Sequence, residues 1–206
     1  MHVIAFVTQK GGSGKTTLAL SCAVAAEEQG ASALVLDMDP QRTAAAWYQT
    51  REATTPKLAT VTAPELPNAI TGGRQRFDVI LIDTPGRDEP STATAIRHAD
   101  LCLIPCRPTP ADMKATPPTV ATIERLSKLS AFVLSQTPPR GYRIREAANG
   151  LRVLGMVAPV HIVFRNAYQD AHGMGLAVTE FEPNGKAAAE IRELWQWIAK
   201  KLENDR

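Results

Sequence analysis

A glycine-rich segment between an apolar run and a helix-like stretch constrains this chain more than any other feature. Residues 8–17 read Thr-Gln-Lys-Gly-Gly-Ser-Gly-Lys-Thr-Thr and directly follow the apolar run Val3–Val7. Gly11, Gly12 and Gly14 let backbone N–H groups close around phosphate oxygens, because no Cβ stands in the way. A lysine and a threonine at the start of the following helix complete a phosphate-binding loop. The segment therefore predicts an α/β fold that binds a nucleoside triphosphate.

The chemistry of the loop assigns expected roles to its side chains. Lys15 supplies a positive charge for the β- and γ-phosphates, and the hydroxyl of Thr16 is a candidate Mg²⁺ ligand. The partial positive charge of the helix N-terminus adds to both. We expect the triphosphate to be held by the loop and the first helical turn, at Gly11, Gly12, Ser13, Gly14, Lys15, Thr16 and Thr17.

Short apolar runs alternate with helical patterns along the chain. The runs are Val3–Val7, Ala33–Leu36, Val79–Ile82, Leu101–Ile104, Phe132–Leu134 and Val160–Phe164, with Leu58–Val61 as a short edge strand. The helical patterns cover Thr17–Gln29, Arg42–Arg51, Ser91–His98, Asp112–Leu129, Arg143–Leu154 and Lys186–Leu202. Continuous apolar strands between helices predict a doubly wound, mostly parallel sheet with helices on both faces. Because no repeat or linker interrupts the pattern, we expect residues 1–206 to form one domain.

Carboxylates follow two of the predicted strands, at the edge where a parallel sheet binds ligands. Asp37 and Asp39 belong to the segment Asp-Met-Asp-Pro-Gln, and Asp83 belongs to Ile-Asp-Thr-Pro-Gly. Carboxylates in these places can hold Mg²⁺ and orient an attacking water. We expect Thr16, Asp37 and Asp83 around the metal and both Asp37 and Asp39 in hydrolysis, while the spacing leaves open which of the two activates water.

The residues after Asp83 suggest a segment that responds to the nucleotide. We expect Gly86 to donate its backbone N–H to the γ-phosphate. Thr84–Asp88 would then act as a switch segment.

The loop departs from the standard P-loop pattern, because Gln9 stands where glycine is usual and a second lysine, Lys10, precedes the glycines. Lys-Gly-Gly-Ser-Gly-Lys-Thr resembles the deviant Walker A signature of the ParA/MinD family of ATPases. The two acidic motifs follow in the order found in that family. The resemblance implies ATP and Mg²⁺ as cofactors and a nucleotide-sandwich homodimer. In that dimer Lys10 would reach the partner's phosphates, while Lys15 holds those of its own subunit.

The resemblance extends over nearly the whole chain and to the short ParA subclass, which lacks an operator-reading extension. It implies base contacts at the end of the strand near residue 134, from Gln136 and Pro138. It also suggests that the loop 105–112 lies near the dimer seam, although its prolines are equally explained as the end of a strand and the start of a helix.

Short ParA-type proteins bind DNA without sequence preference, which requires clustered cations. The candidates here are Arg140, Arg143, Arg145 and Arg165. The resemblance further implies a ParB-like or other small partner protein that stimulates hydrolysis. The cargo would be a plasmid, a chromosome region or a protein assembly, which the sequence does not distinguish.

Two alternatives stay open at this stage. One is a MinD-like protein that docks on a membrane through its last helix, which contains Trp195 and Trp197. The apolar stripe runs through that whole helix, so the pattern favours packing in the core and we do not expect a membrane partner. The other alternative is a metabolic ATP-dependent enzyme on the same fold, against which Lys10 argues.

Net charge and cysteine usage indicate what kind of surface and which cellular compartment to expect. The formal net charge is +2, so any nucleic-acid surface must come from local clustering. Three cysteines without disulfide or metal spacing suit a reducing compartment, and the chain opens directly into its first predicted strand. We expect a cytoplasmic, nucleoid-associated protein.

Overall fold

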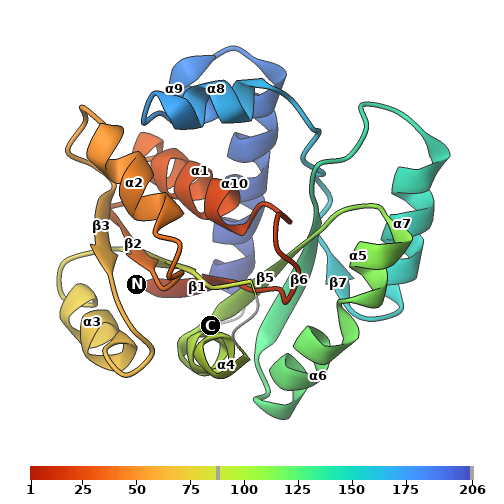
Figure 1. Cartoon of the computed structure of the whole chain (residues 1–206), viewed down its shortest axis with the longest axis horizontal. Coiled ribbons are helices and arrows are strands. Elements are labelled where there is room, and N and C mark those ends of the chain that lie inside the picture. Colours follow the sequence, from red (N-terminus) through yellow and green to blue (C-terminus); the bar gives the residue numbers. More distant parts are fainter. Residues whose placement is uncertain (87–88, 205–206) are drawn as a thin grey trace.

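A seven-stranded parallel sheet forms the centre of the computed structural model, which describes residues 1–86 and 89–204 (Figure 1). Its strand order is β3-β2-β4-β1-β5-β6-β7. The strands are β1 (His2–Phe6), β2 (Ala33–Asp37), β3 (Lys57–Thr60), β4 (Val79–Asp83), β5 (Leu101–Cys106), β6 (Leu129–Leu134) and β7 (Met156–Val157). The predicted parallel α/β fold is confirmed, including the short edge strand that follows Pro56.

Helices cover both faces of the sheet, as the continuous apolar strands require (Figure 1). One face packs against α1 (Lys15–Glu28), α2 (Thr43–Thr50), α8 (Ala167–Gly173), α9 (Val178–Phe181) and α10 (Lys186–Asn204). The other face packs against α3 (Leu66–Gly73), α4 (Glu89–His98), α6 (Pro117–Arg125) and α7 (Tyr142–Arg152), and α5 (Pro110–Lys114) precedes α6. Strand residues alternate between the two cores because successive side chains point to opposite faces.

The register of the central strands brings the acidic motifs together. β4 lies between β1 and β2 and pairs with both. Asp83 is the register partner of Phe6 on one side and of Asp37 on the other. Two carboxylates that are 46 positions apart in the sequence therefore end neighbouring strands, directly beside the loop that follows β1.

Two predicted elements are wrong in detail. The helix expected over Asp112–Leu129 is two helices, α5 and α6, because Pro117 begins the second one and proline cannot continue an existing helix. Leu129 already belongs to β6.

The strand expected at Val160–Phe164 is also wrong, since the seventh strand is Met156–Val157. Pro159 has no N–H to donate to a ladder, so regular pairing stops before it. The chain beyond Pro159 follows the extension of β6 through the bridge between Thr137 and Val163 and through the bond from the Ile162 N–H to the Leu134 carbonyl (2.8 Å).

The last helix packs in the core rather than presenting an apolar face. Its predicted stripe is buried throughout: Ala187, Ile191, Leu194, Trp195, Ile198 and Leu202. These side chains belong to the core shared with α1 and the sheet. Within residues 1–86 and 89–204, no helix has the length and apolar character needed to cross a membrane.

Candidate nucleotide-binding site

The glycine-rich loop runs from the end of β1 to the first turn of α1 and adopts a conformation that needs glycine. Gly12 and Gly14 have φ values of +71° and +97°, in the region that L side chains rarely enter. Gly14 is the N-cap of α1, so the loop ends where the N–H groups of the helix are unpaired. The backbone is therefore shaped for an anion, as its sequence predicts.

The loop is also tied to the end of β6 by two side chains. The Ser135 hydroxyl donates to the Ser13 carbonyl (2.8 Å), and the Gln136 amide donates to the Gly12 carbonyl (2.7 Å). Gln136 itself has a φ of +50°, a conformation uncommon for a residue other than glycine. Sequence reasoning expected a base contact from Gln136, whereas its side-chain amide holds the phosphate loop in place.

A cleft of about 790 Å³ lies over the loop. It brings together residues 11–17, Asp39 to Gln41, Gly86 and Gln136. The predicted triphosphate residues therefore share one cavity with one of the two predicted hydrolytic aspartates. Asp37 and Asp83 lie buried beneath the cleft, while Lys10 and Pro138 are outside its lining.

Asp83 and Thr16 form a pair suited to a divalent cation. The Thr16 hydroxyl donates to Asp83 Oδ2 (2.7 Å), and Asp83 Oδ1 is buried without a hydrogen-bond partner in the described part of the chain. Burial raises the pKa of Asp83 to about 7, and Asp37 adds to the rise, while the Thr16 hydroxyl and the Lys15 ammonium oppose it. A buried carboxylate with an unused oxygen favours a positive charge beside it, so these residues fit Mg²⁺.

Lys15 is a cation whose charge acts on this carboxylate. Its side chain is buried, and this burial lowers its pKa, whereas Asp83 and Asp39 raise it. A desolvated ammonium group gains from an anionic ligand that comes within reach. The cleft thus pairs a buried cation with a buried acid at the place where a triphosphate and its metal would lie.

Asp37 and Asp39 have different surroundings. Both oxygens of the buried Asp37 accept backbone N–H bonds, from Asp39 (3.0 Å) and from Ala45 in α2 (3.1 Å). Burial raises the pKa of Asp37, while those two bonds lower it. Asp39 is half-buried, lines the cleft and accepts the Gln41 N–H (2.9 Å). Asp37 shapes the turn that presents Asp39 to the cleft.

The residues after β4 press against the phosphate loop. The Thr84 hydroxyl donates to the Phe6 carbonyl (2.7 Å), which fixes the start of the segment on β1. A Cβ on Gly86 would lie 3.3 Å from Gly11 Cα and 3.4 Å from Lys15 Nζ. This contact places the backbone of Gly86 beside the loop. The last two residues of the predicted switch segment, Arg87 and Asp88, lie outside the described residues.

A smaller pocket of about 140 Å³ opens beside Gly14 and Thr17. Phe164, Arg165 and Tyr168 line it, and Phe164 is 55% exposed. An exposed aromatic ring next to a phosphate loop can stack on a base. Sequence reasoning missed Phe164 and Tyr168, although an aromatic residue that ends an apolar run beyond the sheet edge was an available signal.

The predicted DNA-binding arginines do not share one environment. Arg140, Arg143 and Arg145 are exposed and make no ion pair with any described residue. Arg165 is half-buried and forms an ion pair with Glu190 of α10. Arg165 would have to leave Glu190 to contact a DNA phosphate.

The proline-rich loop after β5 is closed by its own polar contacts. Asp112 is buried and accepts from the Arg107 guanidinium (3.0 Å) and from the Thr109 hydroxyl. Thr109 in turn caps α5 through the Asp112 N–H (3.2 Å). These bonds support the reading of the loop as a strand end and helix start.

Comparison with known proteins gives consistent results. Residues 4–200 match the family described as CobQ/CobB/MinD/ParA nucleotide binding domain. The maintenance of carboxysome distribution protein A of Gloeobacter kilaueensis is 32% identical over 99% of this chain and 95% of its own length. The protein of the same name from Halothiobacillus neapolitanus is 29% identical over 91% of both chains. The septum site-determining protein MinD of Pyrococcus horikoshii, solved with Mg-ADP, has a TM-score of 0.81 at 16% identity, covering 100% of this chain and 98% of that one.

Proposed function

The chain belongs to the CobQ/CobB/MinD/ParA family of nucleotide-binding domains, and we propose that it is a ParA/MinD-type ATPase that positions cargo. The similarity to two carboxysome distribution proteins along almost the full chain supports a positioning role over a metabolic one. The observation that supports ATP and Mg²⁺ most directly is the cleft itself. It combines a glycine loop with the buried Lys15, and the unpartnered oxygen of Asp83 lies beneath it.

Each part of the cleft has a role in the proposed reaction. Loop N–H groups and Lys15 bind the triphosphate, and Thr16 with Asp83 hold Mg²⁺, which supplies charge neutralisation for phosphoryl transfer when bound. Asp39 orients the attacking water, because it faces the cleft, whereas Asp37 keeps the Asp39 turn in place from beneath. Gly86 offers its N–H beside the loop as part of a segment that responds to the γ-phosphate.

Lys10 gives the proposed ATPase its dependence on dimerisation. Its side chain does not line the cleft of its own subunit, although it immediately precedes the loop. A lysine at this point is available to a second copy that faces the cleft. We propose that ATP closes a homodimer in which each Lys10 reaches the partner's nucleotide, and that hydrolysis opens it.

We propose that the dimer binds DNA. In this proposal the chain is a single ATPase domain, and it works in the cytoplasm at the nucleoid. Arg140 and Arg143 are exposed without an ion pair among the residues described, and dimerisation doubles their number. Phosphate contacts of this kind give affinity without sequence preference. The cargo is a protein assembly or a DNA element. A small partner protein connects this cargo to the dimer, and the same partner protein stimulates hydrolysis.

Gel retardation with ATP and with ADP over a salt series tests this function. We expect retardation with ATP only, a steep loss of affinity with salt and little dependence on DNA sequence. Changing Arg140 and Arg143 together to Glu should abolish retardation while ATP hydrolysis persists, and changing the exposed Arg97 of α4 and Arg125 of α6 together to Glu serves as a charge-matched control. Sedimentation with anionic liposomes in place of DNA would support the MinD-like alternative if ATP-dependent binding occurred there and not on DNA.

A further inference from the structure

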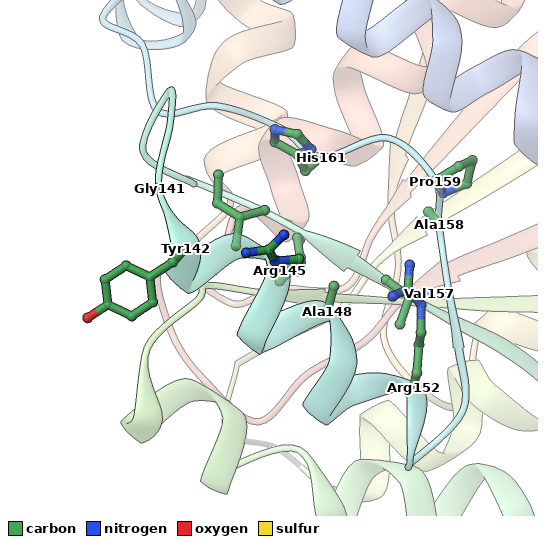
Figure 2. A pocket seen from close by; sticks show the side chains of 11 residues that line it. Gly141, Tyr142, Arg145, Ala148, Arg152, Val157, Ala158, Pro159 and His161 are labelled. Carbon is green, nitrogen blue, oxygen red and sulfur yellow. The ribbon is translucent and has the colours of Figure 1, made fainter.

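A second groove lies away from the nucleotide cleft, between α7 and the chain from Val157 to His161 (Figure 2). Its volume is about 460 Å³. The apolar part of its lining, here called the floor, is formed by Leu134, Ile144, Ala148, Val157 and Pro159. None of the residues that line this groove lines the cleft over the phosphate loop. The proposed ATPase reaction therefore does not account for it.

The groove has a cationic rim. Arg145 and Arg152 lie on the side of α7 that faces the opposite chain, and His161 lies across from Arg145 (Figure 2). Both arginines are exposed, and the lining contains no acidic residue. Arg152 donates to the Asn149 side chain (2.9 Å), and neither arginine forms an ion pair with the residues described. Two guanidinium groups thus face an apolar floor without a counter-charge.

Exposed apolar side chains collect around the same edge of the sheet. Of the six large apolar residues that are exposed in the described chain, four lie in α7, in β7 or in the turn between them: Tyr142, Val153, Leu154 and Met156. Val153 is 85% exposed. β7 is also the last strand of the sheet, so among residues 1–86 and 89–204 one of its edges has no strand partner. Apolar exposure and an open strand edge together are typical of a surface that another chain covers.

We propose that this groove docks an acidic segment of a partner protein that carries aliphatic side chains. Carboxylates of the segment pair with Arg145 and Arg152, and its aliphatic side chains enter the floor between them. A small anion would leave the floor and the flanking apolar residues uncovered. A DNA backbone has no aliphatic side chain to fill the floor, and interfaces with DNA are polar and strongly positive. Charge and apolarity therefore favour a peptide that has both features.

Binding of a defined peptide tests the proposal. The probe is a fluorescein-labelled peptide of Glu-Glu-Leu-Leu repeats, followed by fluorescence anisotropy and by amide chemical shifts of the full chain. We expect saturable binding, with shift changes in α7 and in residues 157–161. Changing Arg145 and Arg152 together to Gln should weaken binding by about tenfold or more, the loss expected for charge-assisted hydrogen bonds. Glutamine keeps part of each aliphatic stem and removes the charge with the guanidinium group.

Matched controls distinguish binding in this groove from non-specific binding of the peptide to the protein surface. Arg143→Gln removes a charge from the same helix but not from the groove, so affinity for the peptide should stay within about twofold. Peptides with Lys for Glu, or with Ser for Leu, should not bind. The proposal is overturned if the acidic peptide fails to bind, if the double variant binds it as well as the wild type, or if the lysine peptide binds equally. It is also overturned if the protein self-associates through the groove, seen as a dimer without nucleotide that the double variant loses.

Discussion

Without nucleotide, the wild type should lose stability as the pH rises through about 7, and Asp83→Asn should not show this loss. Burial raises the pKa of this carboxyl from an ordinary value of 3.8 to about 7. The folded chain therefore holds the proton more tightly than the unfolded chain. The stability that this group contributes is fully present below about pH 4 and is lost as the pH rises through about 7. Asparagine at this position has no charge to lose.

The size of the effect follows from the difference in pKa. One pKa unit corresponds to about 1.4 kcal/mol, so ionising Asp83 costs the folded protein at most about 4 kcal/mol. Between pH 4.5 and 7.5 the wild type should lose about 3 kcal/mol relative to the variant. The amide oxygen can still accept the Thr16 hydroxyl, and the cost of its buried NH₂ group is the same at each pH. The change in the difference with pH therefore reports the ionisation of Asp83 together with its effect on Lys15, whose pKa the Asp83 charge raises.

Urea unfolding at several pH values, without Mg²⁺ or nucleotide, measures this difference. Asp78→Asn is the control, because the Ser32 hydroxyl lowers the pKa of the exposed Asp78 and its contribution changes only below about pH 4. Mg²⁺ and ATP should restore the stability of the wild type at pH 7.5, since the metal takes the place of the proton. Parallel curves for the wild type and Asp83→Asn would refute the account of a costly buried carboxylate.

Two further predictions concern the hydrolytic acid and a glycine remote from the cleft. Asp39→Ala should still bind ATP and stay dimeric, but its rate of ATP hydrolysis should fall by about a hundredfold or more, which is the contribution of a group that orients and deprotonates water. Phosphate release measures this rate. An unchanged rate would exclude Asp39 from the reaction. Gly175→Ala should lose more than about 2 kcal/mol in urea unfolding, because its φ is +69° and a Cβ would lie 2.6 Å from the Arg51 backbone nitrogen. Gly173→Ala is the matched control, since a Cβ there meets nothing within 4 Å, and equal stability of the two variants would contradict the steric argument.

The fold was predictable because most of the sheet is buried on both faces. Strand β4, for example, is therefore apolar without interruption from Val79 to Ile82, and the alternation with helices fixes a parallel sheet. The prediction was wrong where proline decides the local structure. Pro117 divides one expected helix into two, and Pro159 ends the pairing of the last strand after Val157.

The candidate site was predictable to the extent that its chemistry lies in contiguous motifs. The phosphate loop and the two acidic segments are each contiguous in the sequence, and the strands before them bring all three to the same edge of the sheet. Contacts between distant segments left no such signal. The bond from Gln136 to the Gly12 carbonyl joins residues 124 positions apart, and the ion pair of Arg165 with Glu190 depends on how α10 packs. These contacts arise from tertiary packing, which the local pattern does not encode.

Sedimentation velocity with Mg-ATP and with Mg-ADP tests the central claim most directly, using the wild type and Lys10→Ala. Lys10 lies outside the cleft of its own subunit, so the variant should keep its affinity for ATP in a separate titration. We predict that the wild type sediments as a dimer with ATP and as a monomer with ADP, and that Lys10→Ala is a monomer with both. The account would be contradicted if Lys10→Ala dimerised with ATP as the wild type does. It would also be contradicted if the wild type associated to the same extent with ATP and with ADP.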